Sequence, residues 1–256
     1  MDMGLQNRVV FITGSSSGIG RAAAIAFGRE GAKVVVSYHN NRRGAEETAV
    51  MVSEAGGEEP LVVHYDLADD DSIRSAVETI IEHWGAVHVL VNNAVQRAST
   101  GSLREALPFE QVPQKQWRSM IRGSLEGPYL TIQTVLPSMR SEGWGRIVNI
   151  SSGLAERGRP GAGAYAAAKA GLHGLSRTLA RELAADGILT NVVMPGITLT
   201  EMAAENIPSE AMEQVAAQTP TGRLSIPEDV ASLIVYLCSG ANGHVNGEII
   251  KVTGGL

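Results

Sequence analysis

The chain has 256 residues, of which 44% are hydrophobic and 19% are charged, a composition that is typical of globular proteins and argues against a disordered chain. Its formal net charge of −6 argues against nucleic-acid or anionic-membrane partners, because no basic excess exists to neutralise phosphates. A single cysteine, Cys238, excludes an intrachain disulfide, and the six histidines show no metal-ligand spacing. No apolar run approaches the length of a membrane span. We therefore expect a cytoplasmic protein without a metal.

Short β-branched runs alternate with longer helical stretches along the whole chain. In the first half, we expect strands at Val9–Ile12, Lys33–Val36, Leu61–Val63 and Val87–Val91, and helices at Ile19–Glu30, Arg43–Glu54 and Asp70–Trp84. In the second half, we expect one long helical stretch at Gln114–Arg140 that breaks near Pro137, helices at Tyr165–Ala185 and Pro227–Cys238, and strands at Arg146–Ile150, Ile188–Val193 and Glu248–Val252.

The strands are near-continuous apolar runs, as expected when helices cover both faces of a sheet. The alternation therefore predicts an α/β fold with a doubly wound parallel sheet, and residues 1–256 are expected to form one domain. Two irregular segments, near 95–113 and 196–222, interrupt the pattern. In this architecture the loops that follow strand carboxyl ends build the functional site.

A glycine-rich loop at Thr13–Gly20 follows the first strand and opens a helix. Glycines allow a tight turn and close backbone approach, and a helix N-terminus favours a pyrophosphate. We therefore expect a dinucleotide site, although such a loop could also be only a strand-to-helix turn. The residues expected to contact the cofactor here are Gly14, Ser16, Ser17, Gly18, Ile19 and Gly20.

The residues after the second strand favour NADP(H) over NAD(H). An NAD site usually has an acid there for the ribose 2′-hydroxyl, but no acid lies between Glu30 and Glu46. A 2′-phosphate suits His39 and the arginines at 42 and 43, which could otherwise be a solvated helix start. Tyr38, His39, Asn40 and Arg42 are the cofactor contacts expected at this end.

Two further strand ends supply candidate cofactor contacts. Asp66, with Leu67 beside it, follows the third strand, and its carboxylate could accept from the adenine amino group or cap the next helix. Asn93 and Ala94 follow the fourth strand, where they could support the cofactor pocket or only turn the chain.

Tyr165 and Lys169 lie four residues apart, so in a helix they share one face. A fixed ammonium favours tyrosinate, and we expect it to lower the pKa of Tyr165 from about 10 towards neutrality. Such a tyrosine can give a proton to a carbonyl or take one from an alcohol. By itself the spacing also fits a packed tyrosine and a solvated lysine.

Taken together, these residues resemble the short-chain dehydrogenase/reductase family, most closely its 3-oxoacyl-carrier-protein reductase-like branch, over nearly the whole chain. The resemblance implies a Rossmann-type fold with seven parallel strands, and usually a homotetramer or homodimer. It also implies that Tyr165 is the general acid, that Lys169 lowers its pKa and holds the nicotinamide ribose, and that Ser152, thirteen residues before Tyr165, binds the substrate oxygen. Pro195, Gly196, Ile197 and Thr200 are implied as contacts of the nicotinamide end.

Three departures from the family pattern stand out. Ser124 occupies the position where the family usually has an asparagine that holds a proton-relay water. Val95 replaces a glycine beside the cofactor, and the segment from Val95 to Trp117 looks longer than usual. Longer loops at such places are often functional lids.

The expected activity is hydride transfer between NADPH and a ketone or secondary alcohol, most closely that of a 3-oxoacyl-carrier-protein reductase-like ketoreductase. The alternatives are an NAD-linked secondary-alcohol, sugar or steroid dehydrogenase, and a non-catalytic NADPH-binding protein that kept the fold. The substrate is expected to be a small ketone, an alcohol or an acyl thioester. Arg97 and Arg104 could steer an anionic carrier or be solvated charges, and Met202 and Met212 belong to an apolar stripe that suggests a lid.

Overall fold

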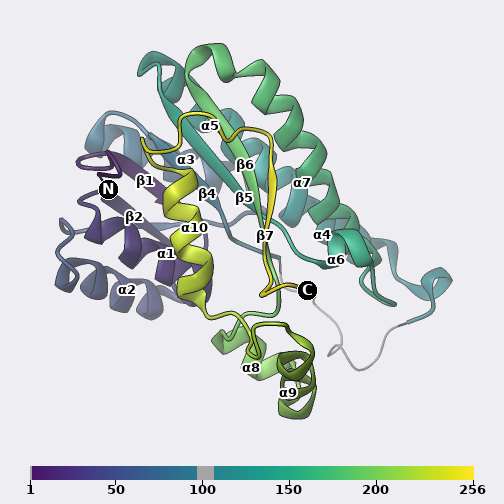
Figure 1. Ribbon diagram of the computed structural model, residues 1–256. Coiled ribbons are helices and arrows are strands. Elements are labelled where there is room, and N and C mark those ends of the chain that lie inside the picture. The colour runs from purple at the N-terminus through teal and green to yellow at the C-terminus, as the bar shows by residue number, and fades with distance from the viewer. Residues whose placement is uncertain (1, 97–106) are drawn as a thin grey trace.

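A seven-stranded parallel sheet in the order β3-β2-β1-β4-β5-β6-β7 forms the centre of the structure, a computed structural model that describes residues 2–96 and 107–256 (Figure 1). The strands are β1 (Val9–Ile12), β2 (Lys33–Tyr38), β3 (Leu61–His64), β4 (Val89–Asn92), β5 (Gly145–Ile150), β6 (Ile188–Pro195) and β7 (Ile249–Val252). The sheet confirms the doubly wound α/β fold that the alternating pattern predicts.

Helices cover both faces of this sheet (Figure 1). On one face lie α1 (Gly18–Arg29), α2 (Arg42–Glu54) and α10 (Pro227–Leu237); on the other lie α3 (Asp70–Trp84), α5 (Gly127–Ser141) and α7 (Gly163–Glu182). Shorter helices are α4 (Gln114–Ile121), α6 (Leu154–Arg157), α8 (Glu201–Asn206) and α9 (Ser209–Gln218). None of these helices in the described part of the chain is long and apolar enough to cross a membrane.

Two apolar cores form because successive side chains of a strand point to opposite faces. In β1, Val10 and Ile12 join the core under α1 and α10, whereas Val9 and Phe11 join the core under α3 and α5. Both faces of each central strand are therefore buried, which explains why these strands read as unbroken apolar runs.

The strand order reverses between β1 and β4, where the chain leaves to opposite sides of the sheet. Ligands of open α/β sheets bind in the crevice outside the carboxyl ends of the strands at such a point. The glycine loop after β1 and the segment 93–96 after β4 lie at this point. The fold thus places the expected cofactor site where the topology opens the sheet.

The predicted helix at Gln114–Arg140 is wrong in two respects. A π-helical turn at Arg122–Glu126 divides it into α4 and α5, and α5 continues to Ser141 through Pro137 instead of breaking there. Pro137 leaves the carbonyl of Gln133 without an N–H partner, but both residues are exposed. Water can therefore satisfy that carbonyl, and the helix tolerates the proline.

The segment 196–222 is not irregular throughout, as the sequence suggested, because it contains α8 and α9. Both helices lie beyond the sheet, beside the start of α10 (Figure 1). In the segment 95–113, the described residues 107–113 contain a 3₁₀ turn at Phe109–Gln111. Residues 97–106, with Arg97 and Arg104, lie outside the described residues.

Candidate active site

The glycine loop after β1 has a shape that only glycine permits at its ends. Gly14 and Gly18 have φ angles of 66° and 53°, in the left-handed region that side chains disfavour. At Gly20, a Cβ atom would collide with the carbonyl of Gly14 and lie 2.7 Å from Nδ2 of Asn93. The loop and the first turn of α1 are therefore packed without room for side chains.

Side chains of the neighbouring strands hold this loop in place. The Ser37 hydroxyl on β2 accepts from the Gly14 amide at 2.9 Å, and the Ser15 hydroxyl accepts from the Ser37 amide at 2.9 Å. From the β4 side, Nδ2 of Asn93 donates to the carbonyls of Thr13 and Gly14, both at 3.0 Å. The first predicted role of Asn93, support of the pocket, matches these contacts better than a simple turn.

The N-terminus of α1 has no side-chain cap, although Ser17 occupies the capping position. The amide groups of the first helical turn are thus free of such a partner and carry the positive end of the helix dipole. A glycine cradle with uncapped amides fits an anionic group such as a pyrophosphate. Gly18, Ile19 and Gly20 are the residues whose backbone could hold it.

Arg21, which the sequence did not single out, ties the loop to its surroundings. Its guanidinium donates to the Ser16 carbonyl at 2.8 Å and to the Thr48 hydroxyl at 3.1 Å. It also lies 3.5 Å from Glu201, at the first turn of α8. These partners belong to the loop, to α2 and to α8, which are separate along the chain. The contacts of Arg21 could therefore be found only from the structure.

Exposed ion pairs surround the expected adenosine end. Nε2 of His39 lies 3.3 Å from a carboxylate oxygen of Asp66. Arg42 pairs with Glu46 at 2.8 Å, and this hydrogen bond raises the pKa of the Arg42 guanidinium. The structure thus brings His39 and Asp66 together, while Arg42 is engaged by its own helix, as the solvated-helix alternative expects.

Neither arginine at this end is free of an acidic neighbour, because Arg43 pairs with Glu47 at 2.9 Å. The capping alternative for Asp66 is wrong: the cap of α3 is Asp69, whose carboxylate accepts from the amides of Asp71 and Ser72. Asp66 itself accepts from the Ala68 amide at 2.8 Å.

The remaining residues of this end line the carboxyl edge of the sheet. Tyr38 ends β2 and is half-buried, and Asn40 is exposed beside it. Leu67 packs against the helix opposite, where a Cβ at Gly123 would lie 2.6 Å from its Cδ1. Ala94 crowds Gly14, whose Cβ would lie 2.9 Å from the Ala94 Cα.

At the carboxyl end of β5, Lys169 is buried and its Nζ donates to the Ile150 carbonyl at 2.7 Å. Burial lowers the pKa of Lys169 to about 8. Its Nζ lies 5.8 Å from the centre of the Tyr165 ring, from which it is separated by one turn of α7. The lysine therefore shares a face with Tyr165, as the spacing predicts.

Tyr165 is half-buried and lies close enough to the Ser152 hydroxyl for that group to affect its pKa, so the structure brings together the two residues that are thirteen positions apart. Burial raises the pKa of Tyr165 above its usual value of 10, while the hydrogen bond with Ser152 lowers it. The expectation of a lowered pKa is wrong for this structure. The reason is that burial of the phenol disfavours tyrosinate by more than its polar neighbour favours it.

Ser124 lies inside the π-helical turn, a feature that often marks functional sites. It is fully buried, and its hydroxyl donates to the sulfur of Met120 at 3.3 Å, one turn earlier in the helix. The turn packs against α7, the helix that carries Tyr165 and Lys169. The described contacts do not link the Ser124 hydroxyl to Lys169.

The segment after β6 closes the site from the side of α8. Gly196 donates to the Val252 carbonyl at 2.9 Å, so Pro195 and Gly196 extend the strand edge, and Ile197 beyond them is half-buried. Thr200 caps α8 by accepting from the Ala203 amide at 3.1 Å. This contact leaves the Thr200 methyl group facing Gly18, whose Cβ would lie 3.1 Å from it.

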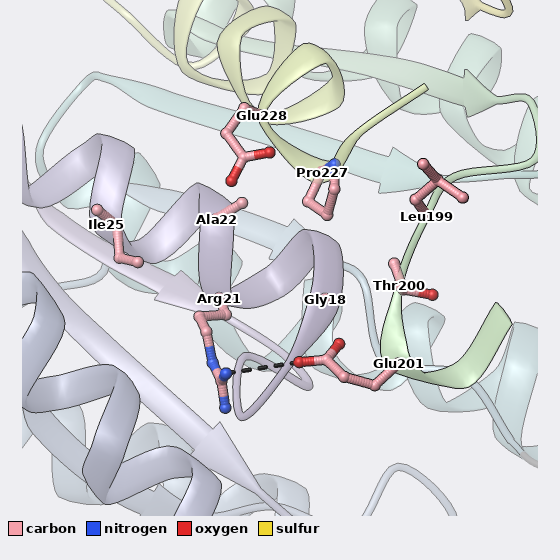
Figure 2. A pocket seen from close by; sticks show the side chains of 9 residues that line it. All are labelled: Gly18, Arg21, Ala22, Ile25, Leu199, Thr200, Glu201, Pro227 and Glu228. Atoms are coloured by element: carbon pink, nitrogen blue, oxygen red, sulfur yellow. Dashed lines mark hydrogen bonds and ion pairs between the residues drawn. The ribbon is translucent and has the colours of Figure 1, made fainter. Parts of the chain in front are cut away.

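Figure 2 shows Gly18 and Arg21 of α1 facing Thr200 and Glu201 across a cavity of about 310 Å³. The cavity lies between α1, residues 199–201 and the start of α10. The Arg21–Glu201 pair is the polar contact drawn across it. Among residues 2–96 and 107–256, no group of three potential metal ligands gathers anywhere.

Comparisons with known proteins agree on one family. A family model described as enoyl-(acyl carrier protein) reductase matches residues 14–256. The chain is 37% identical over 256 residues to the 3-oxoacyl-(acyl-carrier-protein) reductase FabG of Thermotoga maritima, with 99% of each chain covered. It is 36% identical over 254 residues to the FabG of Pseudomonas aeruginosa, again with 99% of each covered. The crystal structure of levodione reductase matches with a TM-score of 0.90 and 29% identity, over 98% of this chain and 97% of that one.

Proposed function

The chain belongs to the short-chain dehydrogenase/reductase family, and we propose that it is an NADPH-dependent ketoreductase acting on 3-oxoacyl thioesters or chemically similar ketones. The observation that carries the proposal is that Ser152 and Tyr165 lie close together beside the buried Lys169, at the same sheet edge as the glycine cradle. An acid, a hydroxyl donor and a cation meet there next to a dinucleotide site.

The cofactor, when bound, supplies the hydride that goes to the carbonyl carbon. The residues that would hold its pyrophosphate are Gly18, Ile19 and Gly20, whose amides have no side-chain cap. Asn93 and Ala94 would border the same cradle. Pro195, Gly196, Ile197 and Thr200 would contact the nicotinamide end, because Thr200 faces Gly18.

A preference for the 2′-phosphate is supported by His39 and Arg42 at the end of β2. Both side chains are exposed; Arg42 would exchange its partner Glu46 for the phosphate, and His39 would keep Asp66 beside it. Asp66, already 3.3 Å from His39, would orient that imidazole and, through its carboxylate, accept from the adenine amino group. Tyr38, Asn40 and Leu67 would complete this end of the pocket.

Tyr165 would donate its hydroxyl proton to the substrate oxygen as the carbonyl becomes an alkoxide. Ser152, which lies near Tyr165, would stabilise the same oxygen. A raised pKa keeps Tyr165 protonated at neutral pH, which suits an acid that works in the direction of reduction. Lys169 would hold the nicotinamide ribose and favour the tyrosinate that remains after proton transfer.

The substrate class is supported by the two relatives named 3-oxoacyl-(acyl-carrier-protein) reductases, which cover almost the whole chain. The matching family model is described as an enoyl reductase, so an enoyl thioester is the substrate that competes with a 3-oxoacyl thioester. We also propose, from the family, a homotetramer or homodimer, to be measured by light scattering.

The test follows NADPH absorbance with a panel that holds a 3-oxoacyl thioester, an enoyl thioester and simple ketones, with NADH in parallel. We expect reduction of the 3-oxo compounds with NADPH and a loss of at least about 100-fold in Tyr165→Phe, which keeps the ring but lacks the acid. Tyr129→Phe, on an exposed tyrosine of α5, is the matched control. Binding of NADPH without consumption across the panel would refute the enzyme and support a binding protein.

A further inference from the structure

Three consecutive residues at the end of β5 each hold a different part of the candidate active site. The Ile150 carbonyl accepts from Nζ of Lys169 at 2.7 Å. The Ser151 hydroxyl donates to the main-chain carbonyl of Lys169 at 3.3 Å, and the Ser152 hydroxyl lies near Tyr165 and affects its pKa. The middle residue, Ser151, therefore joins the strand end to α7 between the two groups proposed for chemistry.

His173 completes this arrangement from α7. It lies one helical turn beyond Lys169 on the same face, and it is buried with 8% of its surface exposed. Its Nε2 lies 2.7 Å from the Ser151 hydroxyl oxygen. A serine hydroxyl has one proton to donate. When Ser151 donates that proton to the Lys169 carbonyl, its oxygen can only accept a hydrogen bond from His173, and Nε2 of His173 then carries a hydrogen.

The surroundings of His173 keep its ring neutral and in one orientation. Burial lowers its pKa, as does the nearby Arg177, whereas Glu156 acts in the opposite direction. Glu156 in turn is paired with Lys251 of β7 at 2.6 Å, and Lys169 and Tyr165 are further ionisable side chains of α7 on this side. A neutral imidazole with hydrogen on Nε2 is a donor of fixed direction, unlike a water or a rotating hydroxyl.

We propose that His173 is a positioning residue for the reduction: by fixing Ser151, it sets where the end of β5 lies against α7, and with it the Ser152 hydroxyl and the Lys169 amine relative to Tyr165. The proposal rests on the proposed function of Tyr165, Ser152 and Lys169. His173 does not itself touch the reacting atoms. An apolar residue at 173 would remove the shorter of the two contacts of the Ser151 hydroxyl, and only its 3.3 Å bond to the Lys169 carbonyl would then hold it against α7.

Four variants test this role: His173→Leu, His173→Gln, Ser151→Ala, and the double variant His173→Leu/Ser151→Ala. With NADPH and ethyl acetoacetate, a small 3-oxo ester, we expect His173→Leu to lower kcat about tenfold, since small misplacements of catalytic groups are costly. KM for NADPH should change less than about twofold, because the phosphate cradle is untouched. Ser151→Ala should give a similar loss, the double variant no further loss, and His173→Gln, which keeps an N–H donor, should recover most of kcat.

His88→Leu is the matched control for removing a buried histidine. Nδ1 of His88 accepts from the Val9 amide at 3.1 Å, at the opposite end of the sheet. This variant should lose thermal stability and keep kcat. A full kcat in His173→Leu, additive losses in the double variant, or an equal kcat loss in His88→Leu would overturn the proposal.

The failure of the proposed function is distinguishable from the failure of this inference. Wild-type protein that binds NADPH and reduces no ketone refutes the function alone. The anchoring of Ser151 is then read from the ¹⁵N resonances of the His173 ring, which should show hydrogen on Nε2 in the wild type and a clear change in Ser151→Ala. Unchanged ring resonances in Ser151→Ala would overturn the anchor, whatever the activity.

Discussion

The two ends of the candidate site hold their polar groups in opposite ways. At the adenosine end, His39, Arg42 and Asp66 are at least partly exposed and pair over 2.8 to 3.3 Å with neighbours that water also reaches. At the hydride end, Lys169 and Ser151 are buried, with 3% and 4% of their surfaces exposed, and each bonds to main chain. Exposed pairs contribute little and can be exchanged, whereas buried polar groups are costly to misplace. Cofactor preference should therefore be easy to change by mutation, and the chemistry should not.

The largest effect that would separate the two ends is expected from Lys169→Met, a change of similar length that removes the cation. We expect kcat to fall at least about 100-fold, because the tyrosinate and the ribose lose their partner. Steady-state kinetics with NADPH and a 3-oxo ester measure this. Lys33→Met, on the strand β2 away from the site, should leave kcat unchanged, and equal losses in both variants would contradict the assignment.

Gly20→Ala should have the next largest effect, since an added Cβ collides with the Gly14 carbonyl and lies 2.7 Å from Nδ2 of Asn93. We expect about a tenfold or greater rise in the Kd for NADPH, because the cradle must open to admit the methyl group. Fluorescence titration of NADPH measures it. Gly174→Ala, in α7 with open space around it, is the matched control and should keep the affinity and gain stability.

The buried Lys169 should also make the free energy of unfolding depend on pH, an effect that the exposed groups of the adenosine end should not produce. Its pKa is about 8 in the folded chain against 10.5 in the unfolded one, so between these values only the unfolded chain keeps the proton. Stability then rises with pH across this window. Relative to Lys169→Met, the wild type should gain about 2 kcal/mol of unfolding free energy from about pH 7.5 to about pH 9.5 in urea titrations. A flat difference would mean that the amine stays charged in its site.

A smaller change is expected at the exposed end from His39→Gln combined with Arg42→Gln. KM for NADPH should rise about fivefold while KM for NADH stays the same, because only the 2′-phosphate loses partners. Arg140→Gln, which breaks the exposed pair with Asp186, should change neither constant. An equal rise for both cofactors would show that these side chains support the loop instead of reading the phosphate.

The smallest change should follow Ser124→Ala. The Ser124 hydroxyl donates to the Met120 sulfur, so its loss should lower kcat less than about threefold. A pH–rate profile of the variant would check it. A drop of about tenfold or more, with an altered alkaline limb, would restore Ser124 to the proton relay that its position in the sequence suggests.

Local features of the site could be predicted from the sequence, because they depend on neighbours along the chain. The glycine cradle and the shared face of Tyr165 and Lys169 are of this kind. The pKa of Tyr165 was predicted in the wrong direction, because the spacing places Tyr165 and Lys169 on one face and says nothing about how deeply Tyr165 itself is buried. Ser151 and His173 are 22 residues apart, so only the packing of β5 on α7 shows that they meet.

The same distinction applies to the fold. The strands were predictable because a strand that is buried on both faces of the sheet has a continuous run of apolar residues. The π-helical turn at Arg122–Glu126 was not, because no sequence pattern in these five residues specifies such a turn, and the turn is selected by what lies on either side of it. Leu67 packs there against Gly123, a contact between segments that are distant in sequence.

That turn also restricts how many residues this segment can have. A π-helical turn holds one residue more than an α-helical turn, and one residue corresponds to about 100° of rotation. The helix before it packs against α7 and the helix after it packs against α3, so the two halves face different neighbours. Deleting a single residue within Arg122–Glu126 would hardly shorten the helix, yet it would rotate one half relative to the other. Only one of the two halves could then keep its packing against α7 or α3. The length of this segment is therefore under tighter constraint than its composition.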